Sequence, residues 1–380
     1  MVGQSAVGIY LHVPFCASRC GYCDFNTYTA VELGDSVRRE DFHEVLAAEV
    51  RMAAAVLGPR EVTTVFVGGG TPTLLGAGAL TALLGVVRAE FSVAEGAEIT
   101  TEANPDSVDE AMLDHLLAGG FTRISFGMQS SSVNVLRTLE RTHTPGAGLA
   151  AARAASAAGF PHVNLDLIYG TPGETDDDLR RSLDDAIAAG VDHVSAYALI
   201  VEDGTPLARR VRRGEIPMPD DDVASSRYAI VDEMLSSAGL AWYEVSNWAR
   251  PGGACQHNLG YWHDADWWGI GPGAHSHVGD ERWWNVKHPR TYAQRLAEGA
   301  APEEGREQLT VEQRHVERIM LGLRLAEGLP VDALGESAFV RAQRQADDGL
   351  LDLNRLREGR LVLTQRGRLL ADGVIRDLVD

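Results

Sequence analysis

The chain has 380 residues, of which 45% are hydrophobic and 23% are charged, a composition typical of a folded globular protein that excludes wholesale disorder. Its formal net charge of −20 repels phosphate groups, which disfavours nucleic acid and an anionic membrane surface as partners. No window reaches the roughly 18 apolar residues of a membrane span, and the first residues do not resemble a signal peptide. We therefore expect a cytoplasmic protein.

Short apolar runs alternate with longer amphipathic segments from Tyr10 to about Trp248. The runs, each a predicted strand, are GIYLHV (8–13), TTVFVGGG (63–70), AEITTEAN (97–104), RISFGMQ (123–129), HVNLDLIYG (162–170), HVSAYALIVE (193–202) and AWYEVSNW (241–248). Predicted helices cover residues 107–120, 145–160, 174–190 and 221–239. This alternation predicts an α/β fold with a parallel sheet and right-handed crossovers, either doubly wound or a full or partial barrel.

Polar and small residues stand at or near the ends of these apolar runs. They are Cys16 to Cys23 after the first run, Gly68 to Pro72 at the second, Glu102 and Asn104 at the third, Gln129 at the fourth and Asp166 within the fifth. In α/β folds the ligand lies at the carboxyl ends of the strands. We therefore expect the seven runs to bring polar groups to one edge of the sheet.

The composition and periodicity of the sequence change after about residue 250. Residues 251–304 are dense in Trp, His and Gly and show no clean period. Residues 305–380 are helical and charged, with a hairpin-like GRLVLT at 359–364. We predict a barrel domain over 1–250, a connecting segment over 251–304, and a small helical, winged-helix-like domain over 305–380.

Three of the four cysteines form the pattern C-x3-C-x2-C at Cys16, Cys20 and Cys23, whereas Cys255 is distant. Clustered thiols in a reducing compartment are more often metal-binding or catalytic than disulfide-bonded. Structural zinc sites are closed by four ligands, whereas three thiolates on a 4Fe–4S cluster leave one iron open. A zinc site completed by a histidine, or three buried thiols, are the alternatives.

The cysteine pattern, with Tyr22 before its last member, resembles that of the radical S-adenosylmethionine (SAM) superfamily. The resemblance implies that the three cysteines hold a 4Fe–4S cluster and that SAM chelates the fourth iron. The segment GGGTPT (68–73) is similar to the glycine motif that meets the SAM amine in that superfamily. Glycines here would expose backbone N–H groups where a Cβ would interfere, and the alternative is a tight turn before a helix.

Four further polar residues suit a charged nucleoside ligand: Glu102, Gln129, Arg141 and Asp166. Each alone could be a solvated or capping residue. Together they offer acceptors for hydroxyl groups, a guanidinium for a carboxylate, and amide donors.

Seven motifs resemble one branch of the superfamily, the oxygen-independent coproporphyrinogen III oxidase family and its relatives. They are YLHVPFC, GGGTPT, EANP, SFGMQS, DLIYGTPGET, LIVEDGTPL and the terminal LTQRGRLLAD. The resemblance implies a partial (β/α)6-type barrel with a helical C-terminal domain. It assigns SAM contacts to Tyr10, Tyr22, Gly69, Gly70, Thr71, Glu102, Gln129, Arg141, Asp166 and Ala198.

The chain departs from the oxidase pattern at Phe25, where the oxidase carries a further cysteine. It also contains HNLGYW (257–262), which is similar to the H-N-x-x-Y-W motif of the HemW subgroup. Proteins of that subgroup resemble the oxidase but are regarded as heme chaperones that hand heme to proteins of the respiratory chain. Two interpretations follow: a heme chaperone with a SAM-bound cluster, or a radical SAM oxidase that decarboxylates coproporphyrinogen III.

The heme chaperone interpretation requires a heme ligand. His257 and Cys255 are the candidate axial ligands, and Tyr261 and Trp262 could pack on the porphyrin face. The alternative for His257 is a structural histidine whose hydrogen bonds are satisfied within the fold. His275 and His277 in GAHSH are further candidates.

Overall fold

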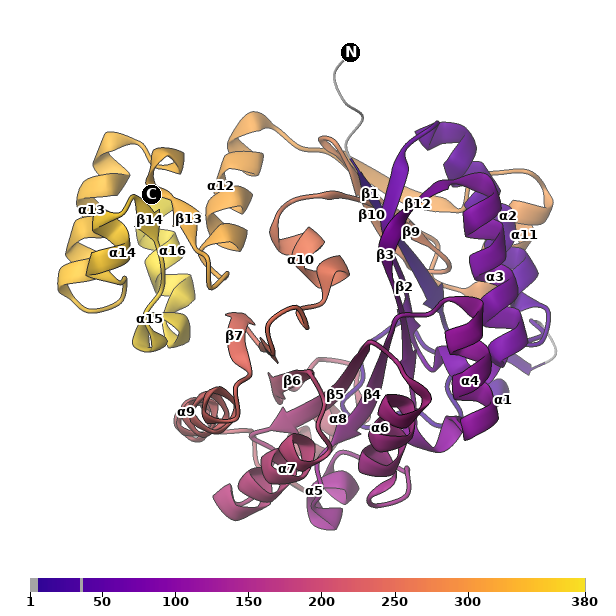
Figure 1. Ribbon diagram of the computed structural model, residues 1–380, viewed down its shortest axis with the longest axis horizontal. Coiled ribbons are helices and arrows are strands. Elements are labelled where there is room, and N and C mark those ends of the chain that lie inside the picture. Colours follow the sequence, from indigo (N-terminus) through magenta and orange to yellow (C-terminus); the bar gives the residue numbers. More distant parts are fainter. Residues whose placement is uncertain (1–5, 35–36, 380) are drawn as a thin grey trace.

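The computed structural model describes residues 6–34 and 37–379, and its centre is a twelve-stranded sheet (Figure 1). Six neighbouring strands are parallel and follow chain order: β1 (Val7–Val13), β2 (Glu61–Gly69), β3 (Ser92–Ala103), β4 (Arg123–Gln129), β5 (His162–Tyr169) and β6 (His193–Ala198). The predicted α/β fold with a parallel sheet is therefore confirmed.

The sheet is parallel because a helical segment follows each of its central strands and packs against it. In β1, Ile9, Leu11 and Val13 share one face and are completely buried, as expected of the face that the helices cover. The covering helices are α2 (Phe42–Leu57), α3 (Ala77–Glu90), α4 (Glu110–Gly119), α6 (Ala147–Ala158), α7 (Asp176–Ala188) and α9 (Asp221–Ser237), which lie outside the sheet (Figure 1). The carboxyl ends of the strands therefore meet at one edge.

Shorter helices and turns complete this part of the chain. They are α1 (Ala30–Leu33), α5 (Val133–Thr138), α8 (Pro206–Arg212), α10 (Gln256–Trp262), α11 (Pro289–Ala297) and the 3-10 turns Pro72–Leu75 and Pro105–Ser107. A further 3-10 turn, Val331–Ala333, belongs to the C-terminal helices.

Antiparallel strands extend the sheet at both ends. Beyond β1, the strand β9 (Asp266–Ile270) pairs in parallel, and β10 (His275–Val278), β11 (Glu281–Asn285) and β12 (Glu303–Gln308) follow antiparallel. Beyond β6 lie β8 (Asn247–Ala249) and β7 (Ala241–Glu244). The prediction of one strand over 241–248 is wrong, because a turn at 245–246 reverses the chain and makes a hairpin.

The C-terminal helices form a lobe beside the sheet (Figure 1). They are α12 (Val311–Gly322), α13 (Glu336–Asp347), α14 (Leu353–Arg357), α15 (Gln365–Leu369) and α16 (Ala371–Val379). A separate apolar core, which includes Ile319, Ala342 and Val374, holds them together. The expected hairpin within 359–364 is not formed, because β14 (Arg360–Leu361) pairs instead with β13 (Leu329–Pro330). Within the described ranges, no helix combines the length and apolar character needed to cross a membrane.

Candidate functional site

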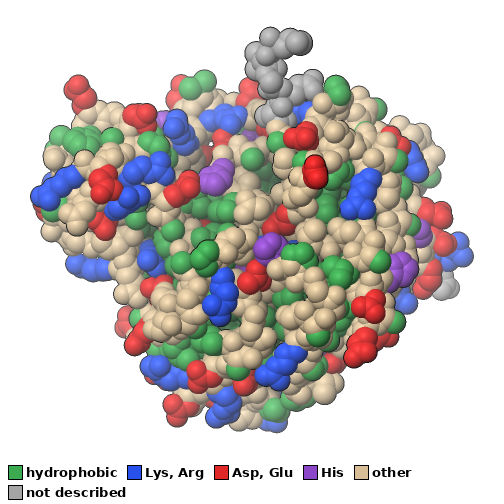
Figure 2. Space-filling view, in the orientation of Figure 1, with side chains coloured by type: hydrophobic (Ala, Val, Ile, Leu, Met, Phe, Trp, Pro, Cys, Tyr) green, Lys and Arg blue, Asp and Glu red, His purple; other side chains and the backbone are tan. Residues whose placement is uncertain are grey.

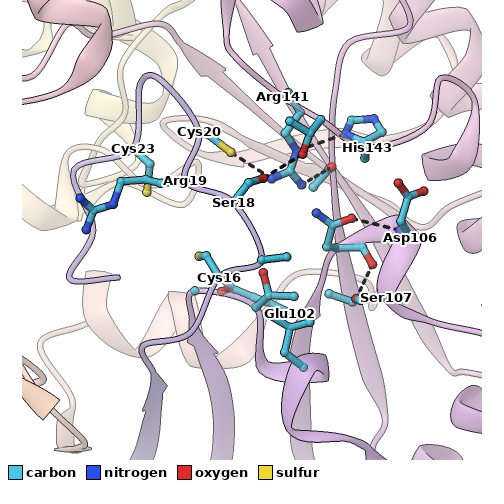
Figure 3. Close-up of a pocket in the computed structure, with 18 of the residues that line it drawn as sticks. Cys16, Ser18, Arg19, Cys20, Cys23, Glu102, Asp106, Ser107, Arg141 and His143 are labelled. Atoms are coloured by element: carbon cyan, nitrogen blue, oxygen red, sulfur yellow. Dashed lines mark hydrogen bonds between the residues drawn. The ribbon is translucent and has the colours of Figure 1, made fainter. Parts of the chain in front are cut away.

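The loop that carries the cysteine pattern, residues 14–29, follows β1 and is closed at its base by backbone hydrogen bonds. The N–H of Cys16 donates to the carbonyl of Tyr28 (2.9 Å), and the N–H of Tyr28 donates to the carbonyl of Pro14 (2.7 Å). Within the loop the N–H of Cys23 donates to the carbonyl of Cys20 (3.3 Å). The three side chains are free thiols, and Figure 3 shows their sulfur atoms around one opening.

The environment of these thiols fits an iron–sulfur cluster. Burial and, to a smaller extent, the nearby thiols of Cys23 and Cys20 raise the pKa of Cys16 to about 11. The pKa of Cys23 is also raised, first by burial. Bound iron would reverse this preference, because a metal cation stabilises the thiolates that bind it. Three soft ligands without a fourth thiol in the loop match a cluster with one open iron.

A cavity of about 310 Å³, here called the cluster cavity, lies between this loop and the strand ends (Figure 3). The three cysteines line it together with these predicted SAM residues: Tyr22, Gly69, Gly70, Thr71, Glu102, Gln129, Arg141 and Asp166. Two predicted SAM residues lie elsewhere. Tyr10 lines two neighbouring cavities, and Ala198 lines a groove beside the C-terminal helices.

The glycine motif is built differently from the prediction that its N–H groups are exposed. The N–H of Gly69 donates to Oε2 of Glu102 (2.9 Å), that of Gly70 to the carbonyl of Val13 (2.8 Å) and that of Thr71 to the carbonyl of Phe15 (2.7 Å). The prediction is therefore wrong for all three groups. Glycine is needed for close approach instead, because a Cβ on Gly70 would lie 2.4 Å from the Phe15 carbonyl oxygen.

Two partly buried carboxyl groups face the cluster cavity. Burial and, to a smaller extent, the nearby Asp166 raise the pKa of Glu102 to about 8, against the opposing hydrogen bond from the N–H of Gly69. Burial also raises the pKa of Asp166, against hydrogen bonds from Ser195, Ser125 and Asn164. A cationic ligand in this cavity would favour the ionised form of both groups. The pair therefore suits a ligand that carries positive charge and hydroxyl groups.

Gln129 holds an unusual backbone conformation at the end of β4. Its φ is +59°, and the pairing of β4 with β5 shifts register between Gly127 and Gln129. Its side-chain Oε1 is buried and finds no hydrogen-bond partner among the described residues. Buried acceptors are nearly always paired in folded proteins, and non-glycine residues at positive φ cluster at functional sites. An unpaired amide oxygen in this cavity therefore fits a ligand with a donor group.

Arg141 connects the cluster loop to the end of the sheet. Its Nη1 donates to Sγ of Cys20 (3.2 Å), its Nη2 to the carbonyl of Gly127 (2.9 Å) and its Nε to Nδ1 of His143 (3.1 Å). Burial and the adjacent guanidinium lower the pKa of His143 to about 4. Sequence analysis missed Gly127 and His143, although both stand within two residues of predicted site residues.

The predicted heme ligands His257 and Cys255 line an interior cavity of about 140 Å³. The ring of His257 makes two hydrogen bonds, through Nδ1 with Oγ1 of Thr64 (2.8 Å) and through Nε2 with the hydroxyl of Tyr261 (2.8 Å). Burial lowers the pKa of His257 to about 4. Sγ of Cys255 donates to Oε1 of Glu98 (3.3 Å), and burial raises its pKa. Heme ligation by either residue would first require these internal hydrogen bonds to break.

Glu98 anchors the segment that contains both candidates. Its carboxylate pairs with Nε of Arg123 (2.9 Å) and accepts the N–H groups of Gln256 (3.1 Å) and His257 (3.0 Å). Both members of the ion pair are buried. From the sequence, Glu98 and Arg123 are expected only as strand residues without a role. No local pattern indicates that Glu98 bonds to His257, about 160 residues away.

Comparisons with known proteins identify relatives of the whole chain. The model of the Radical SAM superfamily matches residues 10–186. The heme chaperone HemW of Mycobacterium tuberculosis (strain H37Rv) is 58% identical over 379 residues, which cover 100% of this chain and 96% of the relative. HemW of Bacillus subtilis is 31% identical over 376 residues, which cover 96% of this chain and 97% of the relative.

A solved structure shares the fold. The coproporphyrinogen III oxidase HemN from Escherichia coli superimposes with a TM-score of 0.84 at 24% sequence identity, covering 99% of this chain and 90% of that chain. The likeness confirms a radical SAM fold that includes the helical C-terminal part.

Proposed function

Because this chain belongs to the HemW family of the radical SAM superfamily, we propose that it is a heme chaperone that binds heme and hands it to acceptor proteins. The observation that carries the proposal is the 58% identity, over the whole chain, with a protein named a heme chaperone. We extend the proposal to acceptors of the respiratory chain and to the cytosol, where clustered thiols stay reduced.

The proposal includes a 4Fe–4S cluster on Cys16, Cys20 and Cys23, with SAM on the open iron. The free thiols around one opening support the cluster. The partly buried carboxyl groups of Glu102 and Asp166 and the unpaired Oε1 of Gln129 support a polar, cationic ligand beside it. SAM would supply radical chemistry when the cluster is reduced. The residues of this chain bind and orient it.

Phe25 bears on the alternative function, the oxidative decarboxylation of coproporphyrinogen III. The oxidase family carries a cysteine at this position, whereas the Phe25 side chain is 61% exposed and lines the cluster cavity. The cluster cavity therefore lacks that thiol. The likeness to HemN extends to the fold and does not favour the oxidase activity for this chain.

One anaerobic experiment tests the proposal. The cluster is reconstituted, and the protein is titrated with hemin while the Soret band is followed. A parallel sample receives SAM, a low-potential reductant and coproporphyrinogen III, and its porphyrins are separated and weighed by mass spectrometry. We expect hemin binding near one per chain and no decarboxylated product. Loss of two carboxyl groups at catalytic turnover would establish the oxidase instead.

A further inference from the structure

A second cavity, of about 660 Å³, lies beside the cluster cavity, between the strands β9 to β11 and the helix α12. Phe25, Gly69 and Glu102 line both cavities. Its volume falls within the range of about 300–1,000 Å³ that is usual for small-molecule sites. The interior cavity of about 140 Å³ that holds His257 is far smaller. A tetrapyrrole therefore has room in the second cavity and none in the interior.

Three histidines line the second cavity, in addition to His257 in the interior. The ring of His12 bonds with the hydroxyl of Tyr10 (3.0 Å) and the carbonyl of Asn26 (2.9 Å). The ring of His277 bonds with the carbonyl of Gly279 (2.9 Å) and lies 3.4 Å from Oδ1 of Asp264. Both nitrogens of each ring are therefore occupied, as they are in His257.

His275 differs from the other three. Its side chain is exposed, and its ring makes no hydrogen bond with any residue that the structure describes. The ring stacks on Trp284, with centroids 5.8 Å apart and an interplanar angle of 25°. Nε1 of Trp267 donates to the carbonyl of His275 (3.1 Å) and fixes its backbone. Partial desolvation and the nearby Lys287 lower the pKa of His275, against the opposing effect of Glu307. A lowered pKa favours the neutral imidazole, the form that binds metals.

We propose that heme binds in the second cavity with His275 as an axial ligand. This inference rests on the proposed function and adds the place and the ligand. It assigns the ligand outside the HNLGYW segment, whose histidine is committed to internal hydrogen bonds.

The walls of the second cavity suit a flat conjugated ring. Trp267 and Tyr261 line the cavity and meet edge to face, with ring centroids 4.7 Å apart. Met320 and Leu321 of α12 also line it. Aromatic and thioether side chains pack well on a planar apolar ligand. Figure 2 shows hydrophobic and histidine side chains at the surface along the boundary between the C-terminal lobe and the barrel.

The charges around the second cavity set the orientation of the heme. Arg282 lines it, but its guanidinium is already paired with Glu317 and with Glu307. Asp264 also lines it, and its carboxylate is paired with Arg314. Arg282 and Arg314 are therefore already paired with carboxylates and are not free to hold the heme propionates. The heme propionates therefore point out toward solvent, where an acceptor protein can reach the ligand.

The test is a hemin titration of the full-length, cluster-reconstituted protein and of His275→Ala. We expect the variant to bind hemin at least about tenfold more weakly, since even outer-shell partners of a metal ligand are worth that much. We also expect altered Soret and electron paramagnetic resonance spectra, restored in part by added imidazole. His315→Ala on α12 is the matched control, because His315 is exposed and does not line the cavity. His275→Tyr gives a second spectral test, since a phenolate ligand changes the ferric spectrum.

The outcomes separate this inference from the proposed function. Wild-type protein that binds hemin, together with a His275→Ala variant of unchanged affinity and spectrum, overturns the assigned ligand and leaves the chaperone standing. Wild-type protein that binds no hemin overturns both. If His257→Gln loses hemin binding while His275→Ala binds hemin as the wild type does, the axial ligand is His257 in the HNLGYW segment and not His275. Iron content and melting temperature of each variant show that the fold and the cluster are intact.

Discussion

The cluster cavity and the second cavity share three lining residues but are built in opposite ways. The cluster cavity is formed by the loops that follow consecutive parallel strands, and its motif N–H groups and its arginine are bonded within the protein. The second cavity lies between β10 and α12, which are about 40 residues apart, and the ring of one of its histidines makes no hydrogen bond with the described residues.

The difference shows how each region can work. A frame whose glycine-motif N–H groups and arginine are hydrogen-bonded within the protein holds the three thiols around one opening, as a cluster requires. A cavity between the sheet and a helix of the adjoining lobe can open when the lobe moves relative to the sheet, because such movements are the general expectation for adjoining domains. A ligand bound there is easier to release. Transfer of heme needs the second property, and retention of a cluster needs the first.

The largest effect is expected from removing one of the cluster cysteines. Cys20→Ala removes a ligand of the proposed cluster, so we expect iron and sulfide contents close to zero after reconstitution. Cys255→Ala is the matched control, since this thiol is also buried and free but lies in the interior cavity. Hemin binding by Cys20→Ala shows whether the two cavities work separately: retained affinity means that they do, and lost affinity means that the cluster loop supports the heme site.

The next largest effect is expected on the free energy of unfolding, from a variant that weakens the attachment of α10 to the sheet. Arg123→Ala leaves the buried Glu98 carboxylate without its ion-pair partner, and we expect a loss of about 3–5 kcal/mol in the free energy of unfolding. Arg355→Ala breaks an exposed pair with Glu358 and should cost less than about 1 kcal/mol. Urea denaturation of both variants measures the difference. Equal losses would contradict the anchoring role of Glu98.

The contrast between the two cavities also explains what the sequence could predict. Polar residues directly after consecutive apolar runs converge at one edge in any parallel α/β sheet, so Cys16, Glu102, Gln129 and Asp166 could be grouped from chain order alone. The hairpin at 241–249 could not, because a single apolar run hides a two-residue turn.

Long-range partners lie beyond such local patterns. His257 is held by Thr64, which is 193 residues away, and by the carboxylate of Glu98. The strand pattern does not distinguish Glu98 from any other strand residue. The separate role of His275 appears only when the hydrogen bonds of every neighbouring histidine are known. The HNLGYW motif therefore pointed to His257, but only the fold shows that the ring of His257 is hydrogen-bonded within the protein.

The pH dependence of SAM binding tests the electrostatics of the cluster cavity. With a pKa of about 8 the Glu102 carboxyl is largely protonated at pH 7, and a cationic ligand binds its ionised form more tightly. SAM affinity should therefore rise between pH 6 and about pH 8, and binding at pH 7 should release protons. Calorimetry in two buffers of different ionisation enthalpy measures that release.

The Glu102→Gln variant isolates this contribution. The amine of SAM also titrates in this range, so part of the pH dependence remains in the variant. We expect the variant to release fewer protons and to bind SAM about tenfold more weakly, as the loss of one charge-assisted hydrogen bond implies. Proton release equal to that of the wild type would assign the titration to another group.

The smallest expected effect is at Phe25, which belongs to both cavities. Its side chain is 61% exposed, so Phe25→Ala should change the free energy of unfolding by less than about 0.5 kcal/mol. If heme covers part of this ring, the variant should bind hemin about two- to fivefold more weakly, a fraction of the energy of burying a whole phenylalanine. Hemin titration checks this, with Val133→Ala as an exposed apolar control that lines neither cavity. Unchanged affinity at Phe25 would place the heme away from the cluster loop, toward α12, and would make the second cavity independent of the cluster.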